Sequence, residues 1–521
     1  MTNSEGEVLY NGIQLPPQWP PRGEFTNDAK PPNDPFYLEL DNIPKVIPVD
    51  LGRQLFVDDF LIESMEGLER IYQHPVKYAG NPVVKADTIL EMNGGHNATA
   101  RPNGGGLWWD PKARCYRFWY EAGWLHTIAY MESPDGITFD KEKFGKYKTN
   151  EIYPPDIIPD SWEVLPDFQK EDPYSNWLMY LRGPGGDLPG LCLESSNGKH
   201  FKNRVLTGSS GDRSNVFWNP FRQKWVFSLR GYRPKDVGRM TCYYETDDFM
   251  SGCKWAWNGG YESEDVVEWA KADELDARHP DFNCPTQLYA LCAVAYESIM
   301  VGAFEIHRGP DNARAANAGM PKITDIVFAY SRDGFHWFRP DRTPAIASEG
   351  WESSKWDAGY VQPLGNLFTI QEEKLCFYYG AFAGDPSRLS SYGHLENDNG
   401  MYHNGATGLA HLRRDGFAAI TGDGTLLTRE ISFTQGDRLF VNADCSQGEI
   451  EVSIIGGEAK TIRSINETKI EVCKASPGTV RISFKISGGA KLYSFWFSNE
   501  TGKSRGYLGG GGPDYPGIQD V

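Results

Sequence analysis

The stretch from Asp212 to Arg230, DRSNVFWNPFRQKWVFSLR, constrains the fold of this chain more than any other. It predicts a strand, a turn and a second strand, because two apolar runs flank the interruption Asn219-Pro220. Polar residues stand just before the first strand, and Arg230-Gly231 stands just after the second. Because a hairpin returns the chain to the edge it left, both polar groups should lie at one edge of a sheet.

The same hairpin unit recurs along the chain. Its other copies are Gly106 to Tyr120, Asp172 to Gly183, Leu288 to Gly309 and Gly365 to Gly380. Most copies are followed by a strand that ends in a turn of the Ser-x-Asp-Gly type, namely Asp135-Gly136, Asn197-Gly198, Asp333-Gly334 and Asp415-Gly416. Repeats of about four strands per roughly 40–50 residues are typical of propeller blades. The sequence therefore predicts an all-β fold centred on a five-bladed β-propeller.

Changes in residue composition and pattern divide the chain into three regions. Residues 1–50 are rich in proline and predict an extended N-terminal arm, docked through Tyr10, Trp19, Phe36 and Tyr37, with a disordered leader as the alternative. Residues 51–427 hold the propeller, and residues 428–521 predict a C-terminal β-sandwich with a Gly-rich tail, mobile or extended. The best helical candidate, Ser263 to Ala272, is short.

Charge and composition restrict the partners. The formal net charge of −18 argues against nucleic acid and anionic membranes. No apolar run is long enough to span a membrane, and the first residues lack a signal-peptide pattern. We therefore expect a cytoplasmic protein, with a trimmed export signal as the alternative. The sequence leaves a homo-oligomer open.

The cysteine and histidine spacings argue against disulfides and metals. Nine cysteines without CxxC pairs predict reduced, mostly buried thiols. Ten scattered histidines without ligand-like spacing predict no zinc site, and we expect no metal and no cofactor.

Several segments carry a resemblance to a known family. The segments YNGIQLPPQWPP, RQLFVDDFLIE, NVFWNPFRQKWVFSLR and LAHLRRDGF look like bacterial glycosyl-hydrolase-like proteins of the invertase/arabinanase type, which are related to five-bladed propeller glycosidases. This resemblance implies a propeller with a C-terminal sandwich and a carbohydrate substrate. The invertase pattern Asn-Asp-Pro-Asn-Gly is absent, and its nearest counterpart, Arg101 to Gly104, has no carboxylate. The family's residue roles are therefore not transferred.

Glycoside cleavage needs two carboxylates, about 5 Å apart for retention or roughly 6.5–9.5 Å apart for inversion. Residues just before each inner strand of a propeller line the central funnel, so acids from different blades can meet there. The catalytic candidates are Asp212, Asp357, Asp167 and Glu121, with Glu91 as an alternative proton donor. For each aspartate the alternative is a turn or capping residue. Glu297 falls at a hairpin turn, which places it at the opposite face.

The funnel positions also supply candidates for substrate binding. They are His96, Arg101, Arg182, Arg213, Arg230, Arg308, Asn215, Tyr360, Gln362 and His403. Arginines 182, 230 and 308 each precede a glycine at the end of a second strand, which suggests a rim that binds an anionic sugar such as a uronic acid. The alternative is that each arginine pairs with an acid of a neighbouring blade.

The leading hypothesis is a glycoside hydrolase acting on an oligosaccharide or other glycoside. A carbohydrate-binding propeller without activity is the second, and a phosphorylase or lyase in the same funnel is the third. The fold alone does not decide among them. A pair of funnel carboxylates favours the hydrolase, and a Tyr or His base beside a neutralised uronate favours the lyase.

Overall fold

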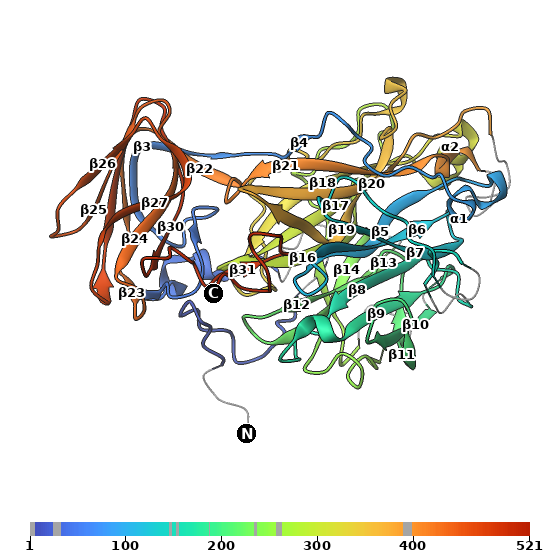
Figure 1. Ribbon diagram of the computed structural model, residues 1–521, viewed down its shortest axis with the longest axis horizontal. Helices are drawn as coiled ribbons and strands as arrows, with labels where there is room; N and C mark the ends of the chain where they lie inside the picture. Colours follow the sequence, from blue (N-terminus) through green and yellow to red (C-terminus); the bar gives the residue numbers. More distant parts are fainter. Residues whose placement is uncertain are drawn as a thin grey trace.

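The computed structural model describes residues 6–23, 25, 33–144, 148–152, 156–186, 188–233, 237–256, 263–388 and 399–521. Within these ranges the chain is nearly all β, with a large body on the right of Figure 1 and a separate C-terminal sheet on its left. None of the helices in these ranges has the length and apolar character needed to cross a bilayer.

Strands of the large body form five successive antiparallel groups among the described residues. Each predicted hairpin unit falls in one group, and it supplies the first strand of that group, the second strand, or both. Group one is β5 (Ala100–Asp110), β6 (Cys115–Ala122) and β7 (Thr127–Ser133); group two is β8 (Ser161–Pro166), β9 (Trp177–Arg182), β10 (Leu188–Ser195) and β11 (Lys202–Ser210); group three is β12 (Asn215–Asn219), β13 (Lys224–Arg233), β14 (Gly238–Thr246) and β15 (Val267–Ala270); group four is β16 (Gln287–Glu297), β17 (Ile299–Gly309) and β18 (Ile323–Ser331); group five is β19 (Gly359–Gln371), β20 (Lys374–Phe382), β21 (Gly405–Arg413) and β4 (Val76–Lys77).

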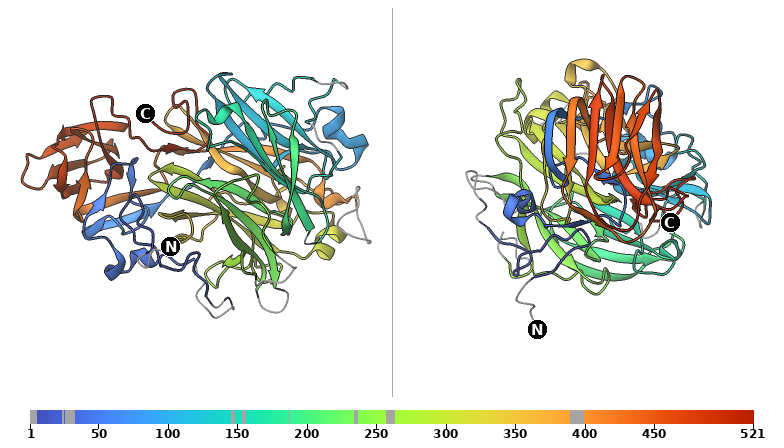
Figure 2. Two further views of the ribbon diagram at one scale, coloured as in Figure 1. Left: turned by 90° about the horizontal axis from the view of Figure 1, so that it is seen from below. Right: turned by 90° about the vertical axis from the view of Figure 1, so that its left-hand side faces the viewer.

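The first strands of the groups gather at the centre of this body. β5 pairs in parallel with β8 and with β19, and β12 packs against β8 and β16. Large aromatic side chains such as Trp119, Trp162 and Trp225 are buried between the groups. This packing favours a ring in which the first strands lie innermost. Figure 2 shows the same body from below, beside the C-terminal sheets.

Three of the four recurring turns place their glycine at positive φ, as the sequence predicts, whereas in the fourth the positive value, 61°, is at Asp415 and not at Gly416. Gly136, Gly198 and Gly334 have φ angles of 70°, 72° and 83°, which an L-residue with a side chain rarely adopts. In each turn the preceding serine hydroxyl accepts a hydrogen bond from the glycine N–H, at 2.8, 3.0 and 2.8 Å respectively.

The helical prediction for Ser263 to Ala272 is wrong, because this segment contains β15 instead. The consecutive β-branched residues Val266 and Val267 favour a strand, and β15 pairs with β14 while burying Trp269. The helices that do form are α1 (Ile89–Met92) and α2 (Asn312–Ala318), with the 3-10 turns η1 (Phe36–Leu38), η2 (Leu40–Asn42), η3 (Asn93–Gly95), η4 (Pro173–Ser175), η5 (Trp351–Ser353) and η6 (Gly400–Tyr402).

The C-terminal part forms a larger and a smaller sheet, and both include strands from the N-terminal region. The larger sheet contains β2 (Gln54–Leu55), β3 (Ile62–Tyr72), β22 (Ala418–Thr428), β24 (Arg438–Asp444), β25 (Glu449–Ile454), β26 (Lys460–Arg463), β27 (Asn466–Lys474), β29 (Ile482–Ser487) and β30 (Lys491–Ser498); the smaller contains β1 (Ile47–Pro48), β23 (Ile431–Phe433) and β28 (Gly478–Val480). Since β22 begins at Ala418, this sheet starts before residue 428 along the chain.

Both ends of the chain pack against the body. In the N-terminal arm Tyr37 is fully buried, and the Tyr10 ring stacks on Phe221 at 4.5 Å between centroids. The Gly-rich tail is extended: β31 (Tyr507–Leu508) pairs with β16, and the backbone of Gly510 accepts a hydrogen bond from Trp109 N–H at 2.8 Å. The tail therefore joins groups one and four at the end of the ring nearest the C-terminal sheets.

Candidate active site

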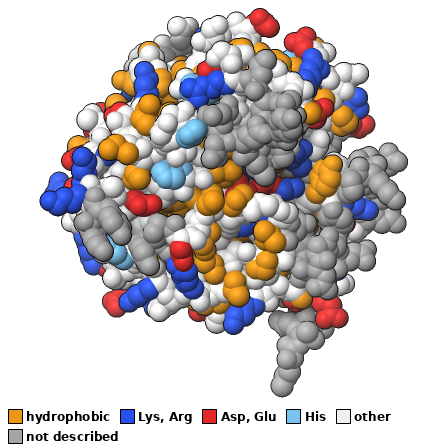
Figure 3. Space-filling view, turned by 90° about the vertical axis from the view of Figure 1, so that its right-hand side faces the viewer, with side chains coloured by type: hydrophobic (Ala, Val, Ile, Leu, Met, Phe, Trp, Pro, Cys, Tyr) orange, Lys and Arg blue, Asp and Glu red, His pale blue; other side chains and the backbone are white. Residues whose placement is uncertain are grey.

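A polar cavity of about 410 Å³ opens where the first strands of the five groups begin. It is lined by Arg101, Asn103, Trp124, Leu125, Asp160, Gly185, Gly186, Asp212, Arg213, Arg230, Arg239, Tyr289, Asn312, Lys322, Tyr360, Gln362, Phe382 and Tyr402. Figure 3 views the molecule from this side, where acidic and basic side chains lie at the edge of a central hollow. The predicted shared edge is therefore the edge that carries the cavity.

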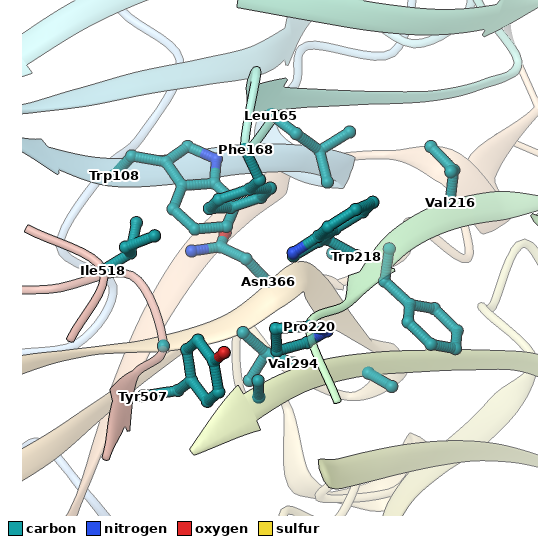
Figure 4. A pocket seen from close by; sticks show the side chains of 15 residues that line it. Trp108, Leu165, Phe168, Val216, Trp218, Pro220, Val294, Asn366, Tyr507 and Ile518 are labelled. Atoms are coloured by element: carbon teal, nitrogen blue, oxygen red, sulfur yellow. The ribbon is translucent and has the colours of Figure 1, made fainter. Parts of the chain in front are cut away.

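The opposite ends of the same five strands enclose a small apolar cavity of about 30 Å³. Trp108, Leu165, Trp218, Val294 and Asn366 surround it, together with Tyr507 and Ile518 of the tail (Figure 4). The first strands thus run in one direction, from the polar cavity to the apolar one. The polar cavity is the candidate active site.

A continuous polar network forms the floor of this site. Arg213 is paired with the fully buried Glu305 at 2.8 Å and donates to Asn103 Oδ1 at 2.7 Å. Glu305 also accepts a hydrogen bond from Gln362 Nε2 at 2.7 Å, and Gln362 Oε1 accepts one from Arg101. The network links groups one, three, four and five, so it fixes the positions of the side chains above it.

Two carboxylates stand at the wall of the site, each just before the first strand of its group. Asp160 precedes β8 and pairs with Arg182 at 3.0 Å, while its side chain is 22% exposed. Asp212 precedes β12, pairs with Arg230, and accepts a hydrogen bond from Tyr289 Oη at 2.9 Å, while its side chain is 25% exposed. Burial raises the pKa of Asp160, against the opposing effect of Arg182. The site therefore combines two carboxyl groups that are each paired with an arginine, and the pKa of Asp160 is raised.

The predicted pairing of Asp212 with Asp357 does not form, because Asp357 lies outside the cavity lining. Its carboxylate pairs with Lys77 Nζ at 2.7 Å and accepts a hydrogen bond from Tyr379 Oη at 3.3 Å. Lys77 belongs to the outer strand β4, which supplies a partner that the repeat pattern did not reveal. Asp357 is therefore a buried member of an ion pair whose lysine is partly exposed.

Asp167 and Glu121 also lie away from the cavity surface. Asp167 follows β8, in the turn before β9, so it stands at the end of β8 opposite to Asp160. Glu121 is fully buried behind the floor, paired with Arg101 at 2.8 Å. The alternative donor Glu91 is fully buried as well and accepts from Tyr120 Oη at 2.6 Å. Glu297 lies at the β16–β17 turn, as predicted.

The candidate binding residues divide into two sets. Arg101, Arg213, Arg230, Tyr360 and Gln362 line the cavity. The remainder lie outside its lining: His96, Arg182, Arg308, Asn215 and His403. Asn215 is buried and donates to Leu291 O at 3.0 Å. Residues 389–398, which precede His403 closely in the sequence, lie outside the described residues. Burial lowers the pKa of the His403 imidazole.

The three rim arginines are each paired with an acid of their own group. Arg182 binds Asp160, Arg230 binds Asp212, and Arg308 binds Asp325 at 2.5 Å. The alternative expected from the sequence was pairing between neighbouring blades. The pairs of Arg182 and Arg230 lie within a group because the second strand returns beside the residue that precedes the first, whereas Arg308 pairs with an acid of the third strand, β18, which lies next to β17.

Asp160, Arg239, Tyr289 and Lys322 line the site although the sequence did not identify them. The sequence does not reveal Asp160 because the Pro-rich flanks of SWEVLP conceal β8, so the repeat pattern places the first strand of the second group at Trp177. The sequence signal that could have identified Asp160 is its position shortly before a strand that contains an aromatic residue, a position that Asp212 also has. The cations on β14 and before β18 belong to no repeated motif.

A further acid, Glu163, lies beneath the site and is fully buried. Neither of its carboxyl oxygens has a hydrogen-bond partner within the described residues, and burial raises its pKa far above the ordinary value. A β-carbon on the adjacent Gly365 would lie 1.7 Å from Glu163 Oε2, so glycine makes room for this side chain. No group of three or more potential metal ligands occurs in the described part of the chain.

Comparisons with known proteins give distant structural likeness. No protein-family model matches the chain, and no curated protein matches it. An exo-β-1,3-galactanase from Phanerochaete chrysosporium, solved with β-1,3-galactotriose, is 9% identical with a TM-score of 0.33, over 82% of this chain and 99% of the other. An N-acetylgalactosamine deacetylase from F. plautii, solved with blood group B trisaccharide, is 11% identical with a TM-score of 0.40, over 68% and 97%. A thermostable family-43 glycoside hydrolase is 11% identical with a TM-score of 0.40, over 64% and 95%.

Proposed function

We propose that this protein is a glycoside hydrolase whose substrate is an oligosaccharide with an acidic sugar. In this proposal the five antiparallel groups are the blades of a β-propeller, and the polar cavity at their shared edge is the active site. The observation that supports it best is the presence of two partly exposed carboxylates, Asp160 and Asp212, in one cavity beside aromatic walls. Paired carboxylates across a bound sugar are what glycosidic cleavage requires.

The surroundings of the two acids suggest their roles. Asp160 is the general acid that protonates the leaving oxygen, because burial favours its protonated form. Asp212 is the nucleophile or base, because Arg230 and Tyr289 stabilise negative charge on its oxygens. Trp124 and Tyr402, whose rings stack at 3.9 Å, offer an apolar face for a sugar ring.

A lyase is the second candidate, and one observation favours it. His307 is buried beside the cavity, both of its ring nitrogens lack a hydrogen-bond partner among the described residues, and its pKa is held well below the ordinary value by burial and by Arg239 and Lys322. A neutral imidazole beside cations that neutralise a uronate suits proton abstraction next to the carboxylate. A lyase would release an unsaturated product that absorbs in the ultraviolet, whereas hydrolysis consumes water and leaves a saturated one.

Screening neutral and acidic oligosaccharides with the wild type, followed by product analysis by NMR, tests the activity. Asp160→Asn and Asp212→Asn should each lower kcat/KM by roughly 100- to 10,000-fold. The matched control Asp357→Asn, outside the cavity, should retain the wild-type rate constants per folded molecule. In the wild type, activity should fall as the pH rises through the raised pKa of Asp160. Full activity in both cavity variants would refute the assignment.

A further inference from the structure

Two cations at the wall of the cavity differ from the other cations that line it. Arg101, Arg213 and Arg230 are each paired with a carboxylate, that of Glu121, Glu305 and Asp212 respectively. Arg239 and Lys322 have no carboxylate partner within the described ranges of the chain. The cavity therefore carries two uncompensated basic side chains, although the whole chain has a net charge of −18.

The two cations lie around the same aromatic side chain. The Arg239 guanidinium is 5.0 Å from the ring centroid of Tyr289, and Lys322 Nζ is 6.0 Å from it. Lys322 Nζ is also 5.7 Å from the ring centroid of Tyr360. Arg239 donates from Nη1 to Gln287 Oε1 at 2.9 Å, which fixes one side of its guanidinium. Lys322 is only 2% exposed, so both its position and its surroundings are set by the fold.

This arrangement is electrostatically unfavourable in the empty cavity. Burial, Arg239 and Arg230 lower the pKa of Lys322 well below its ordinary value, while Asp311 and Glu305 oppose the shift. Tyr289 on β16, His307 on β17 and Tyr360 on β19 carry no carboxylate, and Glu305 on β17 is already paired with Arg213. An anion placed between the two basic groups would reduce the repulsion and raise the pKa of Lys322 toward its ordinary value.

We propose that Arg239 and Lys322 form a carboxylate subsite that receives the uronate group of the substrate. This inference rests on the proposed function and adds the residues that recognise the acidic sugar. An arginine fork binds a carboxylate through two oxygens, and the tyrosine rings beside it offer faces for a sugar ring. Tyr289 joins the subsite to the reaction centre, because its hydroxyl donates to Asp212 Oδ2 at 2.9 Å.

Proton uptake is a consequence that distinguishes this subsite from a structural role. Because an anion beside Lys322 raises its pKa, each binding event should take up as much as one proton at pH values between the lowered pKa of Lys322 in the empty cavity and its ordinary value. The affinity for uronate should therefore decrease as the pH rises, whereas the affinity for a neutral sugar should stay constant over the same range.

Isothermal titration calorimetry with monosaccharides tests the subsite without any need for turnover. The full-length wild type would be titrated with glucuronate, galacturonate, glucose, galactose, sulfate and inorganic phosphate, each in two buffers of different ionisation enthalpy. Lys322→Met and Arg239→Met would be compared with Lys112→Met, which removes the same charge from a side chain that is 70% exposed and lies outside the cavity. Thermal unfolding without ligand would confirm that each variant is folded.

We expect one of the uronates to bind at least tenfold more tightly than its neutral counterpart, with proton uptake. Lys322→Met should abolish the uptake and weaken uronate binding at least tenfold, and Lys112→Met should change neither. Equal binding of uronate and neutral sugar, tighter binding of sulfate or phosphate, or no binding of any sugar would overturn the subsite. Uronate binding without cleavage of any glycoside would support the subsite and refute the hydrolase. Cleavage of neutral glycosides alone would support the hydrolase and refute the subsite.

Discussion

The junction between the ring and the C-terminal sheets depends on a buried ion pair, and breaking it should destabilise the protein strongly. Arg414 and Glu297 are both fully buried, with Nη2 and Oε1 2.8 Å apart. Glu297 Oε2 accepts hydrogen bonds from Arg53 N–H at 3.0 Å and from Ser504 Oγ at 2.6 Å. The guanidinium of Arg414 also lies 3.9 Å from the ring centroid of Tyr515.

Arg414→Met keeps most of the side-chain volume but leaves the Glu297 carboxylate buried without its main partner. Removing one member of a buried ion pair costs about 3–5 kcal/mol. We expect about 3 kcal/mol here, the lower end of that range, because Arg53 Nε remains 3.5 Å from Glu297 Oε1 and the hydrogen bond from Ser504 persists. Glu297→Gln in the Arg414→Met background removes the stranded charge, so it should recover part of the loss.

Urea unfolding, followed by tryptophan fluorescence and by far-ultraviolet circular dichroism, measures the change. The midpoint should shift to lower urea for Arg414→Met and partly return for the double variant. The single variant Glu297→Gln should keep the wild-type kcat/KM, since this residue lies at the end of β16 opposite to the candidate active site. A loss below about 1 kcal/mol for Arg414→Met would refute the reasoning, because that is the value of an exposed pair.

Three further perturbations have definite expected outcomes. Glu163→Gln should raise the Tm more at pH 9 than at pH 4. The pKa of buried Glu163 is raised, so the wild type loses stability as the pH increases above the ordinary pKa of a glutamate. Equal shifts of Tm at both pH values would contradict this. Gly365→Ala should cost about 1–3 kcal/mol in urea unfolding, since its methyl would lie 1.7 Å from Glu163 Oε2, and adding Glu163→Ala should restore part; no rescue would exclude that contact as the cause. Asp415, whose pKa is lowered to about 2 by Arg53 and Arg414 against burial, should lose its contribution of about 2 kcal/mol as the pH falls from about 4 to about 2; an Asp415→Asn variant that loses stability in parallel with the wild type over that range would refute the assignment.

The sequence predicted the strand units because their signals are local. Apolar runs separated by Asn219-Pro220, and turns such as Asp333-Gly334, specify backbone geometry within a few residues. The helical prediction at Ser263 to Ala272 failed because pairing with β14 outweighed a weak helical pattern. The participation of β3 in the C-terminal sheet was not predictable, since its partner β22 lies more than three hundred residues further along the chain.

The candidate site was predicted in its location but only partly in its members. The rule that residues at or just before the start of the first strands share one edge agrees with the cavity positions of Asp212, Arg213 and Tyr360. It failed for Asp357 because a lysine on the outer strand β4, distant in sequence, lies close enough to bind it. Side-chain partners of this kind depend on packing between groups, which no local pattern encodes.

The ion pairs of the rim show why repetition located the edge but did not identify the residues that recognise the ligand. In groups two and three an aspartate before the first strand binds an arginine near the end of the second, and in group one the signs are reversed between Arg101 and Glu121. A repeated pair of this kind neutralises itself, so it contributes rigidity and little net attraction for an anion. Arg239 and Lys322 lie outside the repeated pair, on β14 and directly before β18. Net positive potential in the cavity therefore arises from residues that do not belong to the repeated motif. For the same reason the repeat pattern in the sequence does not predict them.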